Sequence, residues 1–239
     1  MSRTPICVAW ALATCVSIVA PALAQEETAP PAAAVRTMRP VISGRLYAVS
    51  AMKPQATEAA VRILEAGGNA FDAAVAGQAV LALVDPSLNG YGSDAQPLVY
   101  DAKTKKVVAI NAEGTAPKLA TIDWYMKNNG GALPVDDSLL SGTVPGVVDA
   151  WYILLERWGT MTFAQVLQPA LEIAEQGFPL PDALARSIAG RKLQKYPTSM
   201  NLYWPDGKPP QAGDIFRRVS CPWARCWTRA VGRVPVPAF

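Results

Sequence analysis

The chain has 239 residues, of which 51% are hydrophobic and 17% are charged, and its formal net charge is +3. This composition excludes a highly charged disordered chain, and the absence of a long run of Lys or Arg argues against nucleic-acid binding. The sequence contains no histidine, which excludes a Ser-His-Asp triad, a Cys-His pair and a zinc site of the HExxH type.

Residues 1–24 have the pattern of a secretory signal peptide. Residues 6–20 are almost wholly apolar, but the run is shorter than the roughly 20 residues that a membrane-spanning helix needs. Pro21 follows, and Ala22-Leu23-Ala24 then provides a cleavage site of small residues. We therefore expect a periplasmic or secreted protein that has no membrane association after cleavage.

The next segment, residues 25–42, is rich in Pro and Ala and shows no periodicity. We expect it to be a flexible lead-in to a body that covers residues 43–218. The first element predicted in this body is a short strand at Tyr47–Ser50.

Two helices are predicted after this strand. The first begins at Pro54, which the first turn tolerates, and ends at Gly67-Gly68. The second covers residues 70–84, with Asn69 as its N-cap and Asp72 in its first turn. Because this second helix is apolar nearly all round, it must be buried on most sides.

A hairpin and further helices follow along the chain. Leu98–Tyr100 and Val107–Ile110 flank a polar turn, which is typical of a hairpin. Residues 147–158 are predicted to form a helix with its aromatic side chains in the core. A capping box at Thr162 predicts another helix start, and Pro169 is expected to divide the following stretch into two short helices.

The composition changes after a last helix, which is predicted at Pro181–Lys195. Residues 219–239 contain three Arg and no acidic residue, together with Cys221 and Cys226. An altered reading frame would explain this atypical tail, and a genuine basic tail is the alternative. Since the chain has no histidine, the two cysteines favour a local disulfide or two free thiols over a zinc site.

An ordered series of motifs runs through the body. Its members are Gly67-Gly68-Asn69-Ala70, Asp72-Ala73-Ala74-Val75-Ala76, Thr115-Ala116-Pro117, Val144-Pro145-Gly146 and Glu175-Gln176-Gly177-Phe178. In this order they resemble the N-terminal, large-subunit part of the γ-glutamyltransferase family, also called γ-glutamyl transpeptidase or glutathione hydrolase.

The resemblance implies an α+β fold, as part of the N-terminal-nucleophile hydrolase αββα sandwich of two stacked sheets between helical layers. Family members are made as precursors that cut themselves, and the new N-terminal Thr of the C-terminal subunit becomes the nucleophile. Its own α-amine can serve as the base. The substrates are γ-glutamyl amides such as glutathione, and the acyl group passes to water or to an amino acid. No cofactor is expected.

The chain departs from the family pattern at several places. Glu113 stands where the family carries an Arg that grips the substrate α-carboxylate, and residues 90–96 lack most glycines of the family's Gly-rich run. The half that bears the nucleophile is absent, and no Thr-Thr pair occurs. We therefore assign no catalytic, cofactor-binding or metal-ligating residue and expect no activity without the C-terminal subunit.

Two alternatives stay open. The change at Glu113 favours a related amidohydrolase or acylase that takes a different acyl donor. A non-catalytic fragment that binds a partner subunit is the second alternative.

Overall fold

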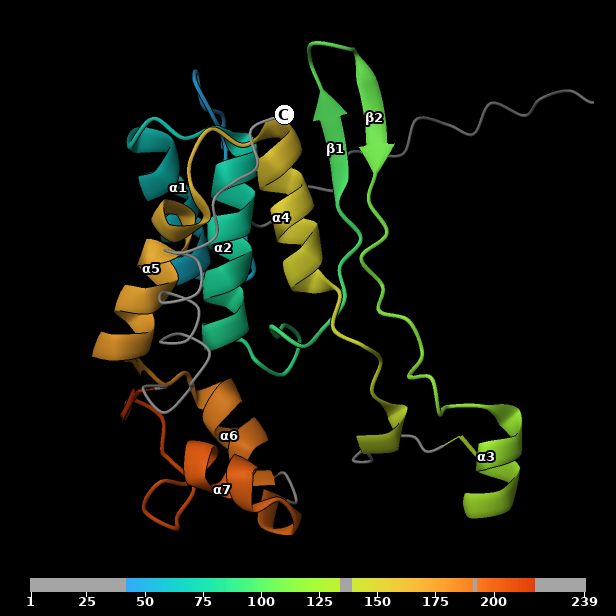
Figure 1. Cartoon of the computed structure of the whole chain (residues 1–239). Helices are drawn as coiled ribbons and strands as arrows, with labels where there is room; N and C mark the ends of the chain where they lie inside the picture. Colours follow the sequence, from blue (N-terminus) through green and yellow to red (C-terminus); the bar gives the residue numbers. More distant parts are fainter. Residues whose placement is uncertain (1–41, 134–138, 191–192, 218–239) are drawn as a thin grey trace, which may run out of the picture. The chain divides into compact units, whose positions relative to one another are not determined.

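The computed structural model describes residues 42–133, 139–190 and 193–217 (Figure 1). The predicted signal peptide, nearly all of the predicted lead-in, and the tail with Cys221 and Cys226 lie outside the described residues. In the described part, no helix is both long enough and apolar enough to cross a membrane.

Helix α2 (Ala70–Val84) is the centre of a helical layer. Three helices pack against it: α1 (Pro54–Glu65), α4 (Val147–Trp158) and α5 (Phe163–Gln176). These neighbours bury most of the α2 residues, as the lack of a polar face predicts. The predicted bounds of α1, α2 and α4 are confirmed to within a residue or two.

The start of α2 is fixed by a buried carboxylate. Asn69 is the predicted N-cap, and with Asp72 it forms a capping box, in which the Asn69 N–H donates to Asp72 Oδ2 at 2.8 Å. Asp72 has no exposed surface, and it also accepts hydrogen bonds from the N–H and Oγ1–H of Thr160 and from the N–H of Met161. Asn69 Nδ2 donates to the Trp158 carbonyl. The carboxylate thus ties α2 to the turn between α4 and α5.

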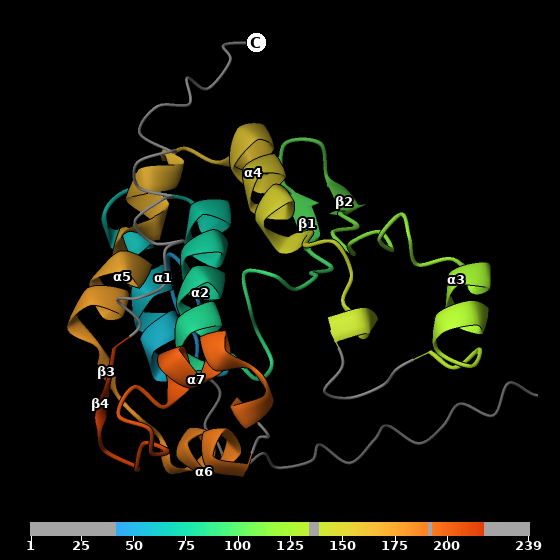
Figure 2. The same ribbon diagram turned by 60° about the horizontal axis from the view of Figure 1, so that its bottom comes forward.

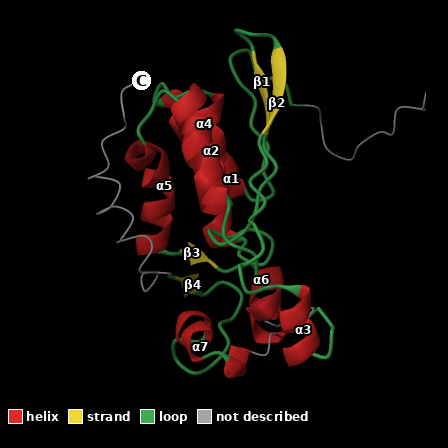
Figure 3. Cartoon of the chain, turned by 45° about the vertical axis from the view of Figure 1, so that its right-hand side comes forward, coloured by secondary structure: helices red, strands yellow, loops and turns green. Residues whose placement is uncertain are grey.

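The strands form two small antiparallel sheets (Figure 3). β1 (Leu98–Asp101) pairs with β2 (Lys106–Ala109), which confirms the predicted hairpin. β3 (Phe178–Pro179) pairs with β4 (Ile215–Phe216). The second pair was not predicted, because two residues are too few to show an alternating pattern. The described fold is therefore mixed α and β, with few strands.

Shorter helices complete the described part. Two of them, α6 (Asp182–Gly190) and α7 (Pro197–Tyr203), lie beside the C-terminal end of α2 (Figure 2). The helix predicted at Pro181–Lys195 is thus shorter than expected: α6 ends at Gly190, and a 3-10 turn, η2, covers Leu193–Lys195.

Two short elements precede α4 in the chain. Helix α3 (Ile122–Asn128), which was not predicted, begins at the N-cap Thr121, whose side chain accepts from the Trp124 N–H. The 3-10 turn η1 covers Leu139–Ser141. The Tyr125 hydroxyl donates to the Leu140 carbonyl at 2.8 Å and joins the two elements.

The prediction that Pro169 divides its helix was wrong. Helix α5 runs without a break from Phe163 to Gln176, with Pro169 buried inside it. An internal proline costs about 3 kcal/mol, because it removes one hydrogen bond and crowds the preceding turn. The capping box at Thr162 and the burial of one helix face offset this cost. The residues buried on that face are Phe163, Val166, Ala170 and Ala174.

The prediction of a strand at Tyr47–Ser50 was also wrong for the described structure. The segment runs beside α1 and α2, but no other described segment forms a ladder with it. A strand is stabilised by a hydrogen-bonded neighbour, and none of the described strands lies alongside these residues.

We expect replacement of the buried carboxylate to destabilise the fold strongly. In Asp72→Asn, an amide NH₂ would replace one carboxylate oxygen and would face N–H and O–H groups that are themselves donors. The lost hydrogen bonds should lower the free energy of unfolding by about 2–4 kcal/mol. Urea unfolding followed by circular dichroism measures the change. The matched control is Asp206→Asn, since Asp206 is exposed and should change stability by less than about 0.5 kcal/mol. Equal stabilities of the two variants would contradict this role for Asp72.

Candidate functional site: the loop platform that carries Glu113

The hairpin continues beyond its assigned strands into two loops. Ala95 and Ala112 exchange backbone hydrogen bonds at 3.4 and 3.1 Å, and the Ile110 N–H donates to the Pro97 carbonyl at 3.0 Å. Residues 95–97 and 110–112 therefore run side by side as a ladder that extends from β1 and β2.

The segment before α4 makes backbone hydrogen bonds with the loops on both sides of this ladder. The Val144 N–H donates to the Thr115 carbonyl at 2.9 Å, and the N–H groups of Gly146 and Val147 both donate to the Ser93 carbonyl. Residues 93–97, 110–116 and 143–147 thus form one hydrogen-bonded unit, which we call the loop platform.

Two glycines permit the close packing of the loop platform. A Cβ atom at Gly114 would overlap the Val144 carbonyl, and one at Gly146 would overlap the Ala112 carbonyl. Any side chain at either position would push the segments apart. This contact gives a physical reason for the glycine in Val144-Pro145-Gly146.

Tyr91 attaches the loop that leads into the platform to the helical layer. Its hydroxyl donates to the Ala79 carbonyl of α2 at 3.1 Å, and its ring meets that of Trp151 edge to face. Trp151 is almost fully buried in α4. The loop is therefore held against both α2 and α4.

Asp101 makes a second connection between the hairpin and α4. Its carboxylate accepts from the Lys103 N–H at 2.9 Å and from the Trp158 indole N–H at 3.4 Å. Desolvation, the largest single effect, raises the pKa of Asp101, but the hydrogen bonds from Lys103, Thr104 and Trp158 together hold this pKa below its ordinary value. The carboxylate is thus charged at neutral pH and retains these contacts.

Glu113 is an exposed carboxylate on the loop platform. Its Oε2 accepts from Gln96 Nε2 at 3.2 Å, and its own N–H donates to Asn111 Oδ1 at 2.9 Å. The sequence singled out Glu113, and the structure adds Gln96, which lies opposite Asn111 in the ladder and reaches Glu113 diagonally. A negative charge here attracts a cation or a hydrogen-bond donor and repels a substrate carboxylate.

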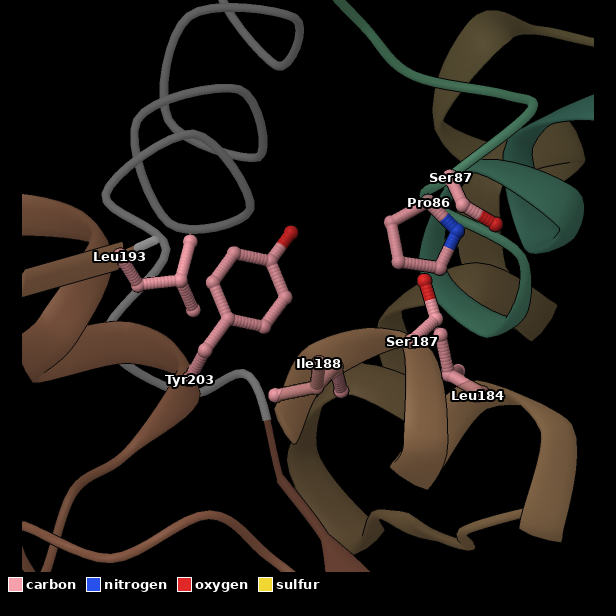
Figure 4. A pocket seen from close by; sticks show the side chains of 7 residues that line it. All are labelled: Pro86, Ser87, Leu184, Ser187, Ile188, Leu193 and Tyr203. Atoms are coloured by element: carbon pink, nitrogen blue, oxygen red, sulfur yellow. The ribbon is translucent and has the colours of Figure 1, made fainter. Parts of the chain in front are cut away.

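A separate cavity of about 150 Å³ lies between the end of α2 and helices α6 and α7 (Figure 4). Ser87 and Ser187 place hydroxyl groups toward one side of it, and Tyr203 lies across from them. The Ser87 hydroxyl donates to Asp85 at 3.4 Å, a long contact to a weak base. Among the described residues that line the cavity, none is a histidine or a lysine that could serve as the base for a serine nucleophile.

Acidic side chains do not gather into a metal site in the described ranges. Over residues 42–133, 139–190 and 193–217, no group of three or more Asp, Glu or Cys residues could hold a metal ion. Besides its backbone amides and carbonyls, the loop platform has two carboxylates, Asp94 and Glu113, two side-chain amides, Gln96 and Asn111, and three hydroxyl groups, Ser93, Thr115 and Thr143.

Comparisons with known proteins cover most of the described chain. A family model, Gamma-glutamyltranspeptidase, matches residues 56–222. The glutathione hydrolase proenzyme of Bacillus subtilis strain 168 is 35% identical over 173 residues, which are 70% of this chain and 29% of that protein. The acylase ACY 1 proenzyme of Pseudomonas sp. strain SE83 is 34% identical over 188 residues, 72% of this chain and 32% of that protein.

A solved structure shows the same fold. The Helicobacter pylori γ-glutamyltranspeptidase matches with a TM-score of 0.73 and 27% identity, over 81% of this chain and 56% of that one. The chain therefore spans less than a third of the curated relatives' length, and its matched region includes α1, α2, the hairpin and the loop platform. The family model spans more than half of the chain, so this chain belongs to the gamma-glutamyltranspeptidase family.

Proposed function

We propose that this chain is the N-terminal, large-subunit portion of an enzyme that transfers or hydrolyses γ-glutamyl groups. The observation that carries the proposal is the match to a glutathione hydrolase proenzyme over 70% of this chain. The match to the fold of a γ-glutamyltranspeptidase supports it independently. The family model, which matches residues 56–222, covers the residues that build the loop platform.

In this proposal the chain binds and positions the substrate, and a partner subunit makes and breaks bonds. The hydroxyl of an N-terminal Thr attacks the amide carbonyl carbon, and its α-amine takes the hydroxyl proton. The amine of the substrate leaves with a proton, and an acyl-enzyme remains. Water or an amino acid then attacks the acyl-enzyme and releases the Thr. None of these steps uses a histidine.

The proposed complete fold is an αββα sandwich. One face of the hairpin supports this idea, because Val99 is buried against the core whereas Leu98, Tyr100 and Val107 are 76%, 60% and 69% exposed. A two-stranded sheet with an open apolar face has little stability by itself. A second sheet from the partner subunit would cover these side chains.

Export to the periplasm or the exterior is the proposed location. Its support is the sequence pattern of residues 1–24, an apolar run followed by an Ala-x-Ala site.

A second candidate function is hydrolysis of an amide with a different acyl group. The observation that favours it is Glu113, which the loop platform holds in hydrogen-bonding distance of Gln96. An acyl donor with an amine or a hydroxyl group at this position would suit a carboxylate better than the α-carboxylate of a γ-glutamyl group. Similarity to an acylase proenzyme also supports this candidate.

We expect the purified 239-residue chain to show no turnover of γ-glutamyl-p-nitroanilide, because in this proposal the nucleophilic N-terminal Thr belongs to the partner subunit. Release of p-nitroaniline, followed by absorbance, measures the activity against a buffer blank. The glutathione hydrolase of Bacillus subtilis serves as the positive control. Turnover above the blank would contradict the proposal that the partner subunit supplies the nucleophile.

Glu113→Arg tests which acyl donor the platform accepts. We produce the chain together with the part of the Bacillus subtilis enzyme that it does not match. Arg should then lower KM for γ-glutamyl-p-nitroanilide by about 10-fold or more, since charge-assisted hydrogen bonds contribute about 1.5–3 kcal/mol.

The matched control for this variant is Glu175→Arg, which makes the same charge change on an exposed position of α5. Unchanged kinetics of the Glu113→Arg variant, or the same change in both variants, would count against Glu113 as the position that selects the acyl donor.

A further inference from the structure

The chain contains two asparagines that are followed by glycine, in the pairs Asn89-Gly90 and Asn129-Gly130. Such a pair is chemically labile, because no Cβ shields the glycine nitrogen from the side-chain carbonyl carbon of the asparagine. Every other asparagine precedes Ala, Asn or Leu. Hydrogen bonds in the structure distinguish the two labile pairs.

The nitrogen that would attack is free in both pairs. Neither the Gly90 N–H nor the Gly130 N–H donates a hydrogen bond to any residue in the described part of the chain. The attacking groups are therefore equivalent, and the asparagine side chains decide which pair reacts.

The two asparagine side chains are held in different ways. Asn129 Nδ2 donates to the Ala132 carbonyl at 2.6 Å, which restrains this amide group at the end of α3. Asn89 Nδ2 is buried and has no hydrogen-bond partner within the described ranges. An unpaired buried donor costs free energy, and loss of this nitrogen as ammonia would remove that cost.

The carbonyl group of the Asn89 side chain is also activated. Its Oδ1 accepts from Gln78 Nε2 of α2 at 3.2 Å, and this hydrogen bond stabilises the negative charge that Oδ1 gains when a nucleophile adds to Cγ. Asn89 lies in neither a helix nor a strand. Asn89 thus combines an unrestrained leaving group, a polarised carbonyl and a free neighbouring nitrogen.

We propose that Asn89 deamidates spontaneously and that the product loosens the loop platform. The Gly90 nitrogen gives its proton to water or hydroxide and attacks Asn89 Cγ, held close by the chain itself. The new C–N bond forms, the Cγ–Nδ2 bond breaks, and Nδ2 takes a proton from water and leaves as ammonia. Water then opens the five-membered imide at either carbonyl, which gives isoaspartate or aspartate. The net reaction consumes one water, releases one ammonia and involves no oxidation.

The modification would disturb a series of hydrogen bonds that begins at Gly90. The Gly90 carbonyl accepts from the Ser93 N–H at 3.2 Å and from the Ser93 hydroxyl at 2.5 Å. The Ser93 carbonyl in turn accepts from the N–H groups of Gly146 and Val147. Isoaspartate adds a methylene group to the main chain just before Gly90. The longer main chain would shift Gly90 and weaken the contacts that hold Ser93 against the start of α4.

Deamidation is measured on the purified full chain and needs no enzyme activity. The chain is incubated at mildly alkaline pH in water enriched in oxygen-18, and its peptides are then released in ordinary water and analysed by mass spectrometry. Oxygen-18 marks a carboxyl group formed during the incubation. In the folded chain Asn89 should react about 10-fold faster than Asn129, because a hydrogen bond restrains only the Asn129 amide nitrogen. In urea the two rates should be similar.

Two glycine variants are the matched controls. Gly90→Ala should slow the reaction at Asn89 about 10-fold, because a Cβ hinders the approach of the nitrogen. The fold has room for this change, since the added Cβ would lie 3.9 Å from the Gly92 nitrogen. Gly92→Ala, where a Cβ meets nothing within 4 Å, should leave the rate at Asn89 unchanged. Circular dichroism verifies that both variants are folded.

Hydrogen exchange read by NMR tests the effect on the loop platform. The amides of Gly146 and Val147 should exchange about 10-fold faster after the incubation than before it, because their shared acceptor has moved. Asn89→Asp adds the negative charge without lengthening the main chain, and it should keep both amides protected.

Several outcomes would overturn the inference. These are no oxygen-18 at Asn89, a rate at Asn89 no higher than at Asn129 in the folded chain, or equal rates in the two glycine variants. Unchanged exchange of Gly146 and Val147 after deamidation, or equal loss of protection in Asn89→Asp, would overturn the effect of the longer main chain. None of these results depends on the proposed γ-glutamyl chemistry.

Discussion

The buried carboxylate of Asp72 is the interaction on which the rest of the described structure depends. A charge without exposed surface is stable only when hydrogen bonds replace its water, and Asp72 obtains them from the start of its own helix and from Thr160 and Met161. The contact fixes α2 relative to the turn that joins α4 and α5. Since α4 begins directly after Gly146, the position of α4 also sets where residues 143–147 contact the other two segments of the loop platform.

The helical layer and the sheets differ in how complete they are. Helix α2 packs against three helices, and most of its residues are buried. In contrast, the hairpin has one open apolar face, and residues 46–52 have unused backbone groups among the described residues. Unpaired strands and open apolar faces are surfaces that proteins normally cover. The surfaces left open here fit a chain that spans 29% of a related proenzyme.

The loop platform depends on the backbone at some positions and on the size or charge of the side chain at others. Residues 90–96 have few of the glycines that the family pattern led us to expect, yet the Ser93 carbonyl still binds the N–H groups of Gly146 and Val147. That contact uses only the backbone of Ser93, and the Ser93 hydroxyl separately donates to the Gly90 carbonyl. Gly114 and Gly146 differ, because a Cβ atom at either would strike a carbonyl. At Glu113 the fold fixes the place of a side chain, and we propose that its charge selects the acyl donor.

The sequence by itself determined the elements that local chemistry specifies. The caps at Asn69 and Thr162, the glycines that end α1 and α5, and the apolar residues of α2 predicted helices that the structure confirms, and the ordered motifs identified the family. The sequence did not predict interactions between residues that are far apart in the chain. Only the tertiary structure showed that Asp72 binds Thr160, that Gln96 meets Glu113, that packing carries α5 through Pro169, and that Tyr47–Ser50 has no strand beside it in the described part. The physical reason is that caps and helix periodicity involve neighbours within four residues, whereas strand pairing, buried charges and loop contacts depend on groups far apart in the chain.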